Sequence, residues 1–275
     1  LLTVIGGFCA ALFSIYTFFR TGDAIGRGSI GQGTSEADPN FFAATLLLPL
    51  ALASAEVFAG RGWLRRTVFL AGTGVIGTAV LLTMSRGALA AVMMITLVFL
   101  IRMRLNWRVL LPVVVLGAGL LFMPRLFFER MHEATNSRVS GREDIWLVGL
   151  HSLKSYGAFG AGADNFSRAY ERYAGTALFF AGDQRDAHNI YLSTSVEFGA
   201  LGIVFLIAAV RSHLRSFPKP DRYLPSSTRI VAFEAACWGI LVAGFSLDLL
   251  WRKVFWLIWA LSAMAIQVQR EASAL

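Results

Sequence analysis

A single histidine stands where a long hydrophilic segment ends and an apolar run begins: His188, directly before Asn189 and Ile190. The pKa of an unperturbed imidazole is about 6.5, so a histidine here can take a proton from a hydroxyl at neutral pH. The position predicts a general base for a substrate that lies partly in lipid and partly in water. From these residues alone, His188 could instead be a structural histidine that only makes hydrogen bonds within the protein. No second His or Cys stands at ligand spacing, so no metal site is predicted there.

Arg86 lies in a short turn, Ser85-Arg86-Gly87, between two apolar runs. A lone guanidinium in a membrane is costly unless it reaches the aqueous interface or pairs with an anion. Its planar fork suits two parallel hydrogen bonds to a phosphate. The turn therefore predicts either an interfacial anchor or an anion clamp at the outer membrane surface, and the spacing alone favours neither.

Arg142 begins a segment whose residues 144–153 have the spacing of an amphipathic helix. Ser140 and Glu143 stand at the positions of a capping box at its start. We expect this helix to lie along the membrane with Trp146 at the level of the lipid headgroups. Taken alone, these residues favour an ordinary interfacial helix with solvated charges.

Other polar features have structural interpretations. The glycines within residues 157–162 fit neither a P-loop nor a dinucleotide fingerprint, and they predict a tight turn. Glu56 and Glu234 stand inside apolar runs close to arginines, and we interpret them as ion pairs. Glu197 and Asp248 do not form an obvious proton relay with them.

The elements that position these residues belong to a membrane protein. Of the 275 residues, 56% are hydrophobic and 15% are charged, whereas soluble domains carry about a quarter charged residues. Helices that face lipid need no polar outer surface, which accounts for this balance. The net charge of +8 does not indicate nucleic-acid binding, because no basic soluble module is visible. Cys9 and Cys237 fall inside apolar runs and predict neither a disulfide framework nor a metal site.

The apolar runs predict an all-α, polytopic bundle of about eight transmembrane helices, since one crossing takes about 20 residues. The predicted spans are residues 1–19, 41–59, 67–84, 88–101, 109–123, 190–210, 230–247 and 254–268. We expect them to form one integral membrane domain over residues 1–275. We also expect the sequence to begin inside a larger membrane protein that has further spans before it.

Basic residues are concentrated in alternate short loops, at residues 61–66, 102–108 and 211–229. The positive-inside rule places these loops in the cytoplasm. The long segment 124–187 then lies outside, and it carries basic and acidic residues in equal number. Long segments translocate largely regardless of their charge, so its arginines do not contradict this topology. Arg86 and His188 are therefore expected on the same outer side.

Several short motifs follow one another on that outer side. They are Asp38-Pro39-Asn40-Phe41-Phe42-Ala43, Ser85-Arg86-Gly87, Gly141-Arg142 followed by Ile145-Trp146, the Gly160/Gly162 turn, and His188-Asn189 followed by Glu197 and Gly199. This ordered set resembles the O-antigen ligase and O-antigen polymerase superfamily of bacterial membrane glycosyltransferases. The resemblance extends over nearly the whole chain. Each motif is too short to identify the family by itself, and it is their order that is specific for the family.

The resemblance implies a glycosyltransferase C-type fold with a partly helical periplasmic loop at residues 124–187. It implies an inverting transfer without metal ion or cofactor, on the periplasmic face of the bacterial inner membrane, within lipopolysaccharide biosynthesis. The donor is then a glycan on undecaprenyl pyrophosphate, and the acceptor is lipid A–core, a protein or another glycan. By the same resemblance, Arg86 and Arg142 hold the pyrophosphate and His188 deprotonates or orients the acceptor hydroxyl. Further substrate contacts are then expected from Arg138, Trp146, Arg185 and Asn189.

The sequence leaves alternatives to a ligase. A polymerase of the same superfamily uses the same donor. A bicarbonate-type transporter is a second alternative, since some members have been described as such, and an assembly subunit without catalysis is a third. A transporter concentrates ionisable groups near the membrane midplane. Here the densest cluster lies at the predicted outer interface, which favours the transferase.

Overall fold

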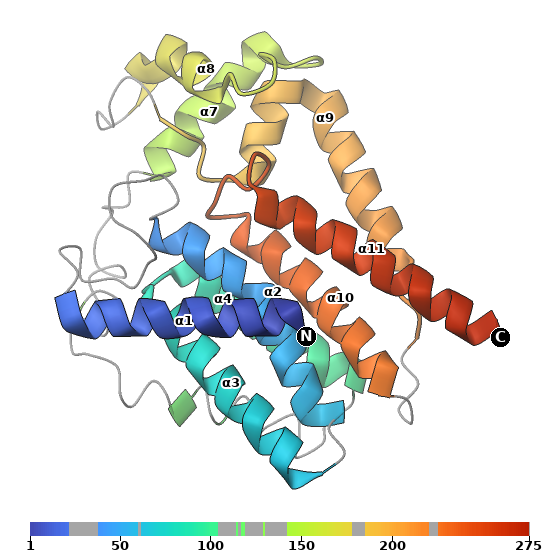
Figure 1. Cartoon of the computed structure of the whole chain (residues 1–275). Coiled ribbons are helices and arrows are strands. Elements are labelled where there is room, and N and C mark those ends of the chain that lie inside the picture. The colour runs from blue at the N-terminus through green and yellow to red at the C-terminus, as the bar shows by residue number, and fades with distance from the viewer. Residues whose placement is uncertain are drawn as a thin grey trace. The chain divides into compact units, whose positions relative to one another are not determined.

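The computed structural model describes residues 1–21, 38–59, 62–103, 142–177, 185–219 and 225–274, with the single positions 114, 117, 118 and 129. Regular structure in these residues is entirely helical (Figure 1), which confirms the predicted all-α class. The elements are α1 (Leu2–Thr21), α2 (Pro39–Ala59), α3 (Trp63–Leu82), α4 (Arg86–Met103), α7 (Arg142–Tyr156), α8 (Phe166–Tyr173), the 3-10 helix η2 (Ala174–Thr176), α9 (Ile190–Arg215), α10 (Pro225–Ala243) and α11 (Lys253–Ala274).

Five helices of the described part are long and apolar enough to cross a membrane: α1, α2, α3, α4 and α9. They stand at the places of the first four predicted spans and of the sixth. α10 and α11 are helical where the last two spans were predicted, but they are not among these five. The predicted span 109–123 lies outside the described residues. The total of about eight spans therefore stays a prediction.

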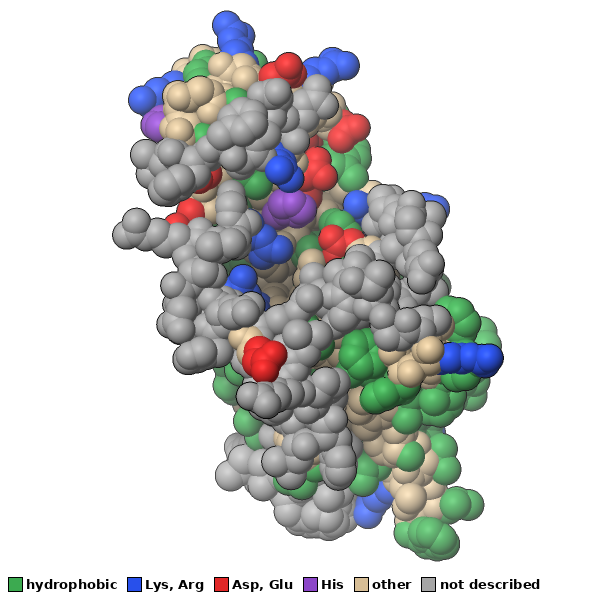
Figure 2. All heavy atoms as spheres, turned by 90° about the vertical axis from the view of Figure 1, so that its left-hand side faces the viewer, with side chains coloured by type: hydrophobic (Ala, Val, Ile, Leu, Met, Phe, Trp, Pro, Cys, Tyr) green, Lys and Arg blue, Asp and Glu red, His purple; other side chains and the backbone are tan. Residues whose placement is uncertain are grey.

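The chain forms two compact units. Unit 1 comprises Leu1–Met131, Phe217–Ala243 and Trp256–Leu275, and unit 2 comprises His132–Ser216 and Gly244–Phe255. On the face seen in Figure 2, the described side chains of unit 1 are largely hydrophobic, whereas those around α7 and α8 of unit 2 include many charged groups. That the whole chain is one integral membrane domain stays a prediction.

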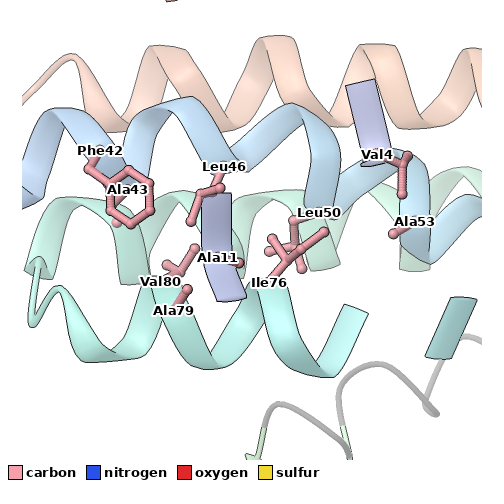
Figure 3. Packing of buried hydrophobic residues seen from close by; sticks show 11 residues of the cluster. Val4, Ala11, Phe42, Ala43, Leu46, Leu50, Ala53, Ile76, Ala79 and Val80 are labelled. Carbon is pink, nitrogen blue, oxygen red and sulfur yellow. The ribbon is translucent and has the colours of Figure 1, made fainter. Parts of the chain in front are cut away.

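α2 is the central helix of unit 1. Most of its residues are buried, and it packs against α1, α3, α4 and α10. Small side chains allow this close approach: Ala43 and Ala53 of α2 lie in one apolar cluster with Ala11 of α1 (Figure 3). A Cβ atom on Gly7 would overlap the Pro49 ring, so α1 crosses α2 in direct contact at this point.

Arginines and carboxylates join the helix ends at one end of unit 1. Glu56 of α2 accepts hydrogen bonds from Arg65 of α3 at 2.6 Å and from Arg229 of α10 at 2.5 Å. Arg102, in the last turn of α4, donates to Glu234 of α10 at 2.7 Å. The predicted ion pairs of Glu56 and Glu234 are therefore confirmed. The three arginines come from the three loops that the positive-inside rule places together, and unit 1 brings them to one end of its helices.

Unit 2 contains residues 142–177 and 185–187 of the long hydrophilic segment, and this part is partly helical as expected. α7, α8 and the first part of α9 enclose an apolar cluster that includes Val148, Phe166 and Val196. A Cβ atom on Gly149 would come within 2.8 Å of the Leu192 side chain. A glycine in α7 thus allows close contact with α9.

α9 is broken at Gly199, whose backbone has φ 67° and ψ −163°. The turn of residues 157–162 restores the hydrogen bonding that the break interrupts. The amides of Ala161 and Gly162 donate to carbonyls of α9 at 2.8 and 2.9 Å, and the amide of Ala200 donates back to the turn at 2.9 Å. The tight turn predicted from the glycines is confirmed. Figure 1 shows the two parts of α9 running in different directions.

The two arms of α9 differ in their surroundings. The first arm (190–198) is largely buried within unit 2. The second arm (200–215) exposes large apolar side chains, among them Val204, Phe205 and Ile207. The sequence predicted one continuous span over 190–210, and the left-handed backbone of Gly199 divides it. The residues next to His188 therefore belong to the packed part of unit 2.

Candidate active site

Arg86 is the first residue of α4 and follows a tight turn. Two hydroxyls fix this turn: Ser85 Oγ accepts from the Ala88 amide at 3.3 Å, and Thr83 Oγ1 accepts from the Ser85 amide at 3.3 Å. Met84, between them, has φ 52°. Thr83 and Ser85 are buried, whereas Arg86 is exposed. The fold thus holds this guanidinium at the N-terminus of α4, where the helix dipole also favours an anion.

Arg142 is the first residue of α7, and Trp146 follows about one turn later. The Trp146 indole Nε1 donates to the carbonyl oxygen of Ala187 at 3.1 Å. Ala187 is fully buried and directly precedes His188. This hydrogen bond places the first turns of α7 beside the backbone at His188. The predicted capping residue Ser140 lies outside the described residues, and the expected position of Trp146 at the lipid headgroups stays a prediction.

His188 lies directly before α9 in the left-handed region of the backbone, with φ 45°, and its side chain is half-buried. Asn189 is the N-cap of α9. Its Oδ1 accepts from the amides of Tyr191 and Leu192 at 2.9 and 3.1 Å. Such a cap stabilises a helix by about 0.5–2 kcal/mol relative to Ala. The cap fixes where α9 begins and therefore where the His188 backbone stands.

The three predicted catalytic residues share one setting, the N-terminus of an α-helix. Arg86 and Arg142 are the first residues of their helices, and His188 stands next to the N-cap of α9. Backbone N–H groups at such ends favour anions. Apart from glycine, the described residues with left-handed φ are Met84, Asp164 and His188. Such conformations cost about 1–3 kcal/mol each and gather at functional sites.

Glu197 receives hydrogen-bond donors from three segments of unit 2. Its Oε2 accepts from the Asp164 amide and from the Trp251 indole, both at 3.2 Å. Its Oε1 accepts from the Phe166 amide at 3.4 Å and from the Ser193 hydroxyl at 3.3 Å. The residue is only 2% exposed. This carboxylate therefore connects the start of α8, the first arm of α9 and the segment 244–252.

Asp248 stands beside the first turn of α9. Its carboxylate accepts a hydrogen bond from the Leu250 amide and lies within hydrogen-bond reach of the Ser193 side chain, whose one O–H is donated to Glu197. Its Oδ1 is buried and has no hydrogen-bond partner in the part of the chain that the structure describes. Burial raises the pKa of Asp248 above its ordinary value, and nearby Asp186 adds to this, whereas the hydrogen bonds and Arg252 lower it. The residue before Ala187 and the segment 244–252 therefore meet near the start of α9.

The structure describes some of the remaining predicted site residues and not others. Arg185 is exposed and stands three residues before His188 in the chain. Arg138 lies outside the described residues. Arg86 belongs to unit 1, whereas Arg142 and His188 belong to unit 2, and a common site of all three stays a prediction. Within the described residues, no group of three or more His, Cys, Asp and Glu side chains could hold a metal ion.

Asp248 and Trp251 support the first arm of α9 and were absent from the predicted site. They stand in the segment 244–252, which meets the start of α9 where the Ile190 amide donates to the Gly244 carbonyl at 2.9 Å. The sequence did contain one indication of their importance: both residues follow an apolar run on the predicted outer side. Sequence spacing could not show their partners, because these lie far earlier in the chain.

A comparison with known protein families gives a match for this chain. The sequence model of the O-antigen ligase family matches residues 68–207. This range covers about half of the chain and contains Arg86, Arg142 and His188, together with the glycine turn and the break in α9. A comparison with curated proteins gives no match.

Proposed function

Because the chain belongs to the O-antigen ligase family, we propose that it transfers a glycan from undecaprenyl pyrophosphate to a hydroxyl of an acceptor such as lipid A–core. The reaction takes place on the periplasmic face of the bacterial inner membrane. The family match supports a ligase-type or polymerase-type glycosyltransferase, and the five apolar helices support a multi-pass membrane protein. The donor, the acceptor and the membrane face are parts of the proposal.

The observation that carries the proposal is the hydrogen bond from Trp146 to Ala187. It joins the first turns of α7, which begin with Arg142, to the residue before His188. A cation suited to a phosphate and a base suited to a hydroxyl are thus held by neighbouring segments of unit 2. This combination is what group transfer from a pyrophosphate leaving group requires.

In the proposed reaction, the acceptor hydroxyl attacks the anomeric carbon of the donor sugar with inversion. The bond from this carbon to the pyrophosphate oxygen breaks, and the pyrophosphate leaves with the electron pair. His188 takes the hydroxyl proton, which contributes about 10²–10⁴ in rate. Arg86 and Arg142 stabilise the charge that grows on the pyrophosphate, and loss of one such group costs about 10²–10³. We include no metal ion or cofactor in this mechanism.

The other substrate contacts follow from the same proposal. Arg185 and Arg138 are further cations for the phosphates or acidic sugars of the donor. Trp146 is partly buried against the apolar cluster of unit 2 and donates its indole N–H to Ala187; we propose that the exposed part of its ring contacts a sugar. Asn189 uses its Oδ1 for the helix cap, so its Nδ2 is the group left to donate to a substrate oxygen.

The test is transfer by the purified full-length protein from a lipid-linked oligosaccharide with two acceptors, lipid A–core and a second lipid-linked glycan. A product on lipid A–core supports the ligase. Lengthening of the lipid-linked glycan instead identifies a polymerase with the same donor chemistry. Uptake of labelled bicarbonate into proteoliposomes, with no transfer to either acceptor, would contradict the proposal and favour a transporter.

A further inference from the structure

Glu197 is a buried carboxylate without a role in the proposed reaction. It lies on the first arm of α9, one helical turn after Ser193, and its four donors are two backbone amides, a hydroxyl and an indole. A carboxylate is an acceptor at both oxygens, and each oxygen here receives two donors. Three of the donors, at residues 164, 166 and 251, lie far from Glu197 in the sequence. The Glu197 side chain therefore links the start of α8 and the segment 244–252 to the first arm of α9.

The same segments meet at the start of α9. The Ser193 amide donates to the Asn189 carbonyl at 2.9 Å, and the Ile190 amide donates to the Gly244 carbonyl at 2.9 Å. The rings of Tyr191 and Phe245 are in contact, with centroids 4.5 Å apart. The segment that holds Trp251 against Glu197 therefore also holds the first turn of α9.

The backbone at His188 depends on this support. A left-handed histidine is strained and persists only where its surroundings determine its conformation. Trp146 fixes the carbonyl of Ala187 on one side, and the capped first turn of α9 fixes the other side. If the first arm of α9 shifts, the backbone at His188 is free to relax.

We propose that Glu197 is a positioning residue: by holding the first arm of α9 against the start of α8 and the segment 244–252, it keeps His188 where the acceptor proton is taken up. This inference rests on the proposed function, because His188 is the group that Glu197 positions. Glu197 itself does not touch the substrate in this account.

The informative substitution is Glu197→Gln. It preserves the size of the side chain, but one acceptor oxygen becomes an NH₂ group that faces N–H donors. Trp251→Phe is a milder second variant, since it removes one of the four donors and leaves the carboxylate. Ser195→Ala is the matched control, because within the described residues the Ser195 hydroxyl on the same arm donates to the Tyr191 carbonyl of its own helix, at 2.7 Å.

The experiment measures kcat and the donor KM of the purified full-length protein together with amide exchange of residues 160–170. A small displacement of a catalytic group lowers rates up to about 100-fold, so we expect Glu197→Gln to lower kcat about 10–100-fold. The donor KM stays within about twofold, because the donor is held by arginines. Trp251→Phe lowers kcat less, and Ser195→Ala leaves it within about twofold. Exchange at the Asp164 and Phe166 amides becomes faster in Glu197→Gln.

A double-mutant cycle separates positioning from a general structural role. If Glu197 acts through His188, Glu197→Gln has no further effect on kcat in the His188→Ala background. An equal additional loss in that background, or an unchanged kcat in Glu197→Gln, overturns the inference. If the unmodified protein transfers no glycan, the proposed function fails by itself. Amide exchange then decides about Glu197: faster exchange supports its holding role, and unchanged exchange overturns it.

Discussion

Buried carboxylates have different partners in the two units of this protein. In unit 1, Glu56 and Glu234 accept hydrogen bonds from arginines at the ends of helices. In unit 2, Glu197 accepts from backbone amides, an indole and a hydroxyl. The arginine pairs join whole helices, whereas the neutral donors fix single backbone positions. The first arrangement joins helices of the bundle, and the second holds backbone segments next to the proposed site, where groups must be held within a fraction of an ångström.

This difference predicts separate consequences for substitutions in the two regions. Substitutions of Gly199 and Arg142 in unit 2 should change glycan transfer, and substitutions at the charged end of unit 1 should change stability while the folded protein stays active.

The largest effect is expected from Gly199→Ala. A Cβ atom there would overlap the Ala158 carbonyl oxygen, and the left-handed backbone adds strain of about 1–3 kcal/mol. We expect the contact between the glycine turn and α9 to be lost and transfer to fall below detection. Gly175→Ala is the control, because a Cβ atom on Gly175 would have no neighbour within 4 Å. Measured transfer and a protease-resistance assay of unit 2 check this, and a fully active Gly199→Ala protein contradicts it.

Arg142→Ala tests whether the start of α7 belongs to the site that carries out transfer. Loss of a cation that stabilises the pyrophosphate should lower kcat/KM about 10²–10³-fold. Lys154→Ala removes an exposed cation in the last turn of the same helix and should change kcat/KM by less than about twofold. Steady-state kinetics with the lipid-linked donor decide the matter. Equal losses in both variants would point to net charge of the helix and not to a site at Arg142.

At the charged end of unit 1, the two carboxylates differ in their number of arginines. Arg102→Ala takes from Glu234 the arginine that neutralises it, so we expect unfolding to become easier by about 1–3 kcal/mol. Arg65→Ala leaves Glu56 with Arg229 and should cost less than about 1 kcal/mol. Thermal unfolding in detergent measures both variants. If the Arg102→Ala protein is as stable as the unmodified protein but has lost transfer, the proposed difference between the roles of the two units is wrong.

The smallest effect is expected from Asp248→Asn. The pKa of Asp248 is raised in the folded protein, chiefly by burial, so ionisation of this group opposes folding. Its contribution to stability is complete below the pKa of the unfolded chain, about 3.9, and is lost as pH rises through the folded pKa. The amide does not ionise, so the variant should unfold at a higher temperature than the unmodified protein at pH 7. At a pH below about 3.9 the difference should disappear, and a variant that is less stable both there and at pH 7 contradicts the assignment.

Much of the bundle was predictable from the sequence, because single apolar runs correspond to single helices. The run that becomes α2 begins after Asp38, whose Oδ1 accepts from the Asn40 amide at 2.7 Å, with Pro39 at the first helical position. The ion pairs of Glu56 and Glu234 were predictable too, since a carboxylate in an apolar run needs a cation and arginines stood close to the helix ends.

The framework of the candidate site was less predictable. Residues 190–210 read as one apolar run, and the break at Gly199 depends on a turn about 40 residues earlier that supplies the missing hydrogen bonds. Glu197 was visible as a carboxylate in a motif, but its donors at Asp164 and Trp251 lie on other segments. Long-range backbone contacts of this kind have no periodicity in the sequence.

The central claim is that His188 takes the acceptor proton, and one measurement tests it most directly. Glycan transfer is compared between His188→Ala and His151→Ala, which removes another half-buried imidazole of unit 2, hydrogen-bonded to Thr176 at 3.1 Å. We predict that His188→Ala lowers kcat about 10²–10⁴-fold while the protein remains folded. His151→Ala should keep kcat within about twofold. A folded His188→Ala protein that transfers glycan at the unmodified rate would contradict the account.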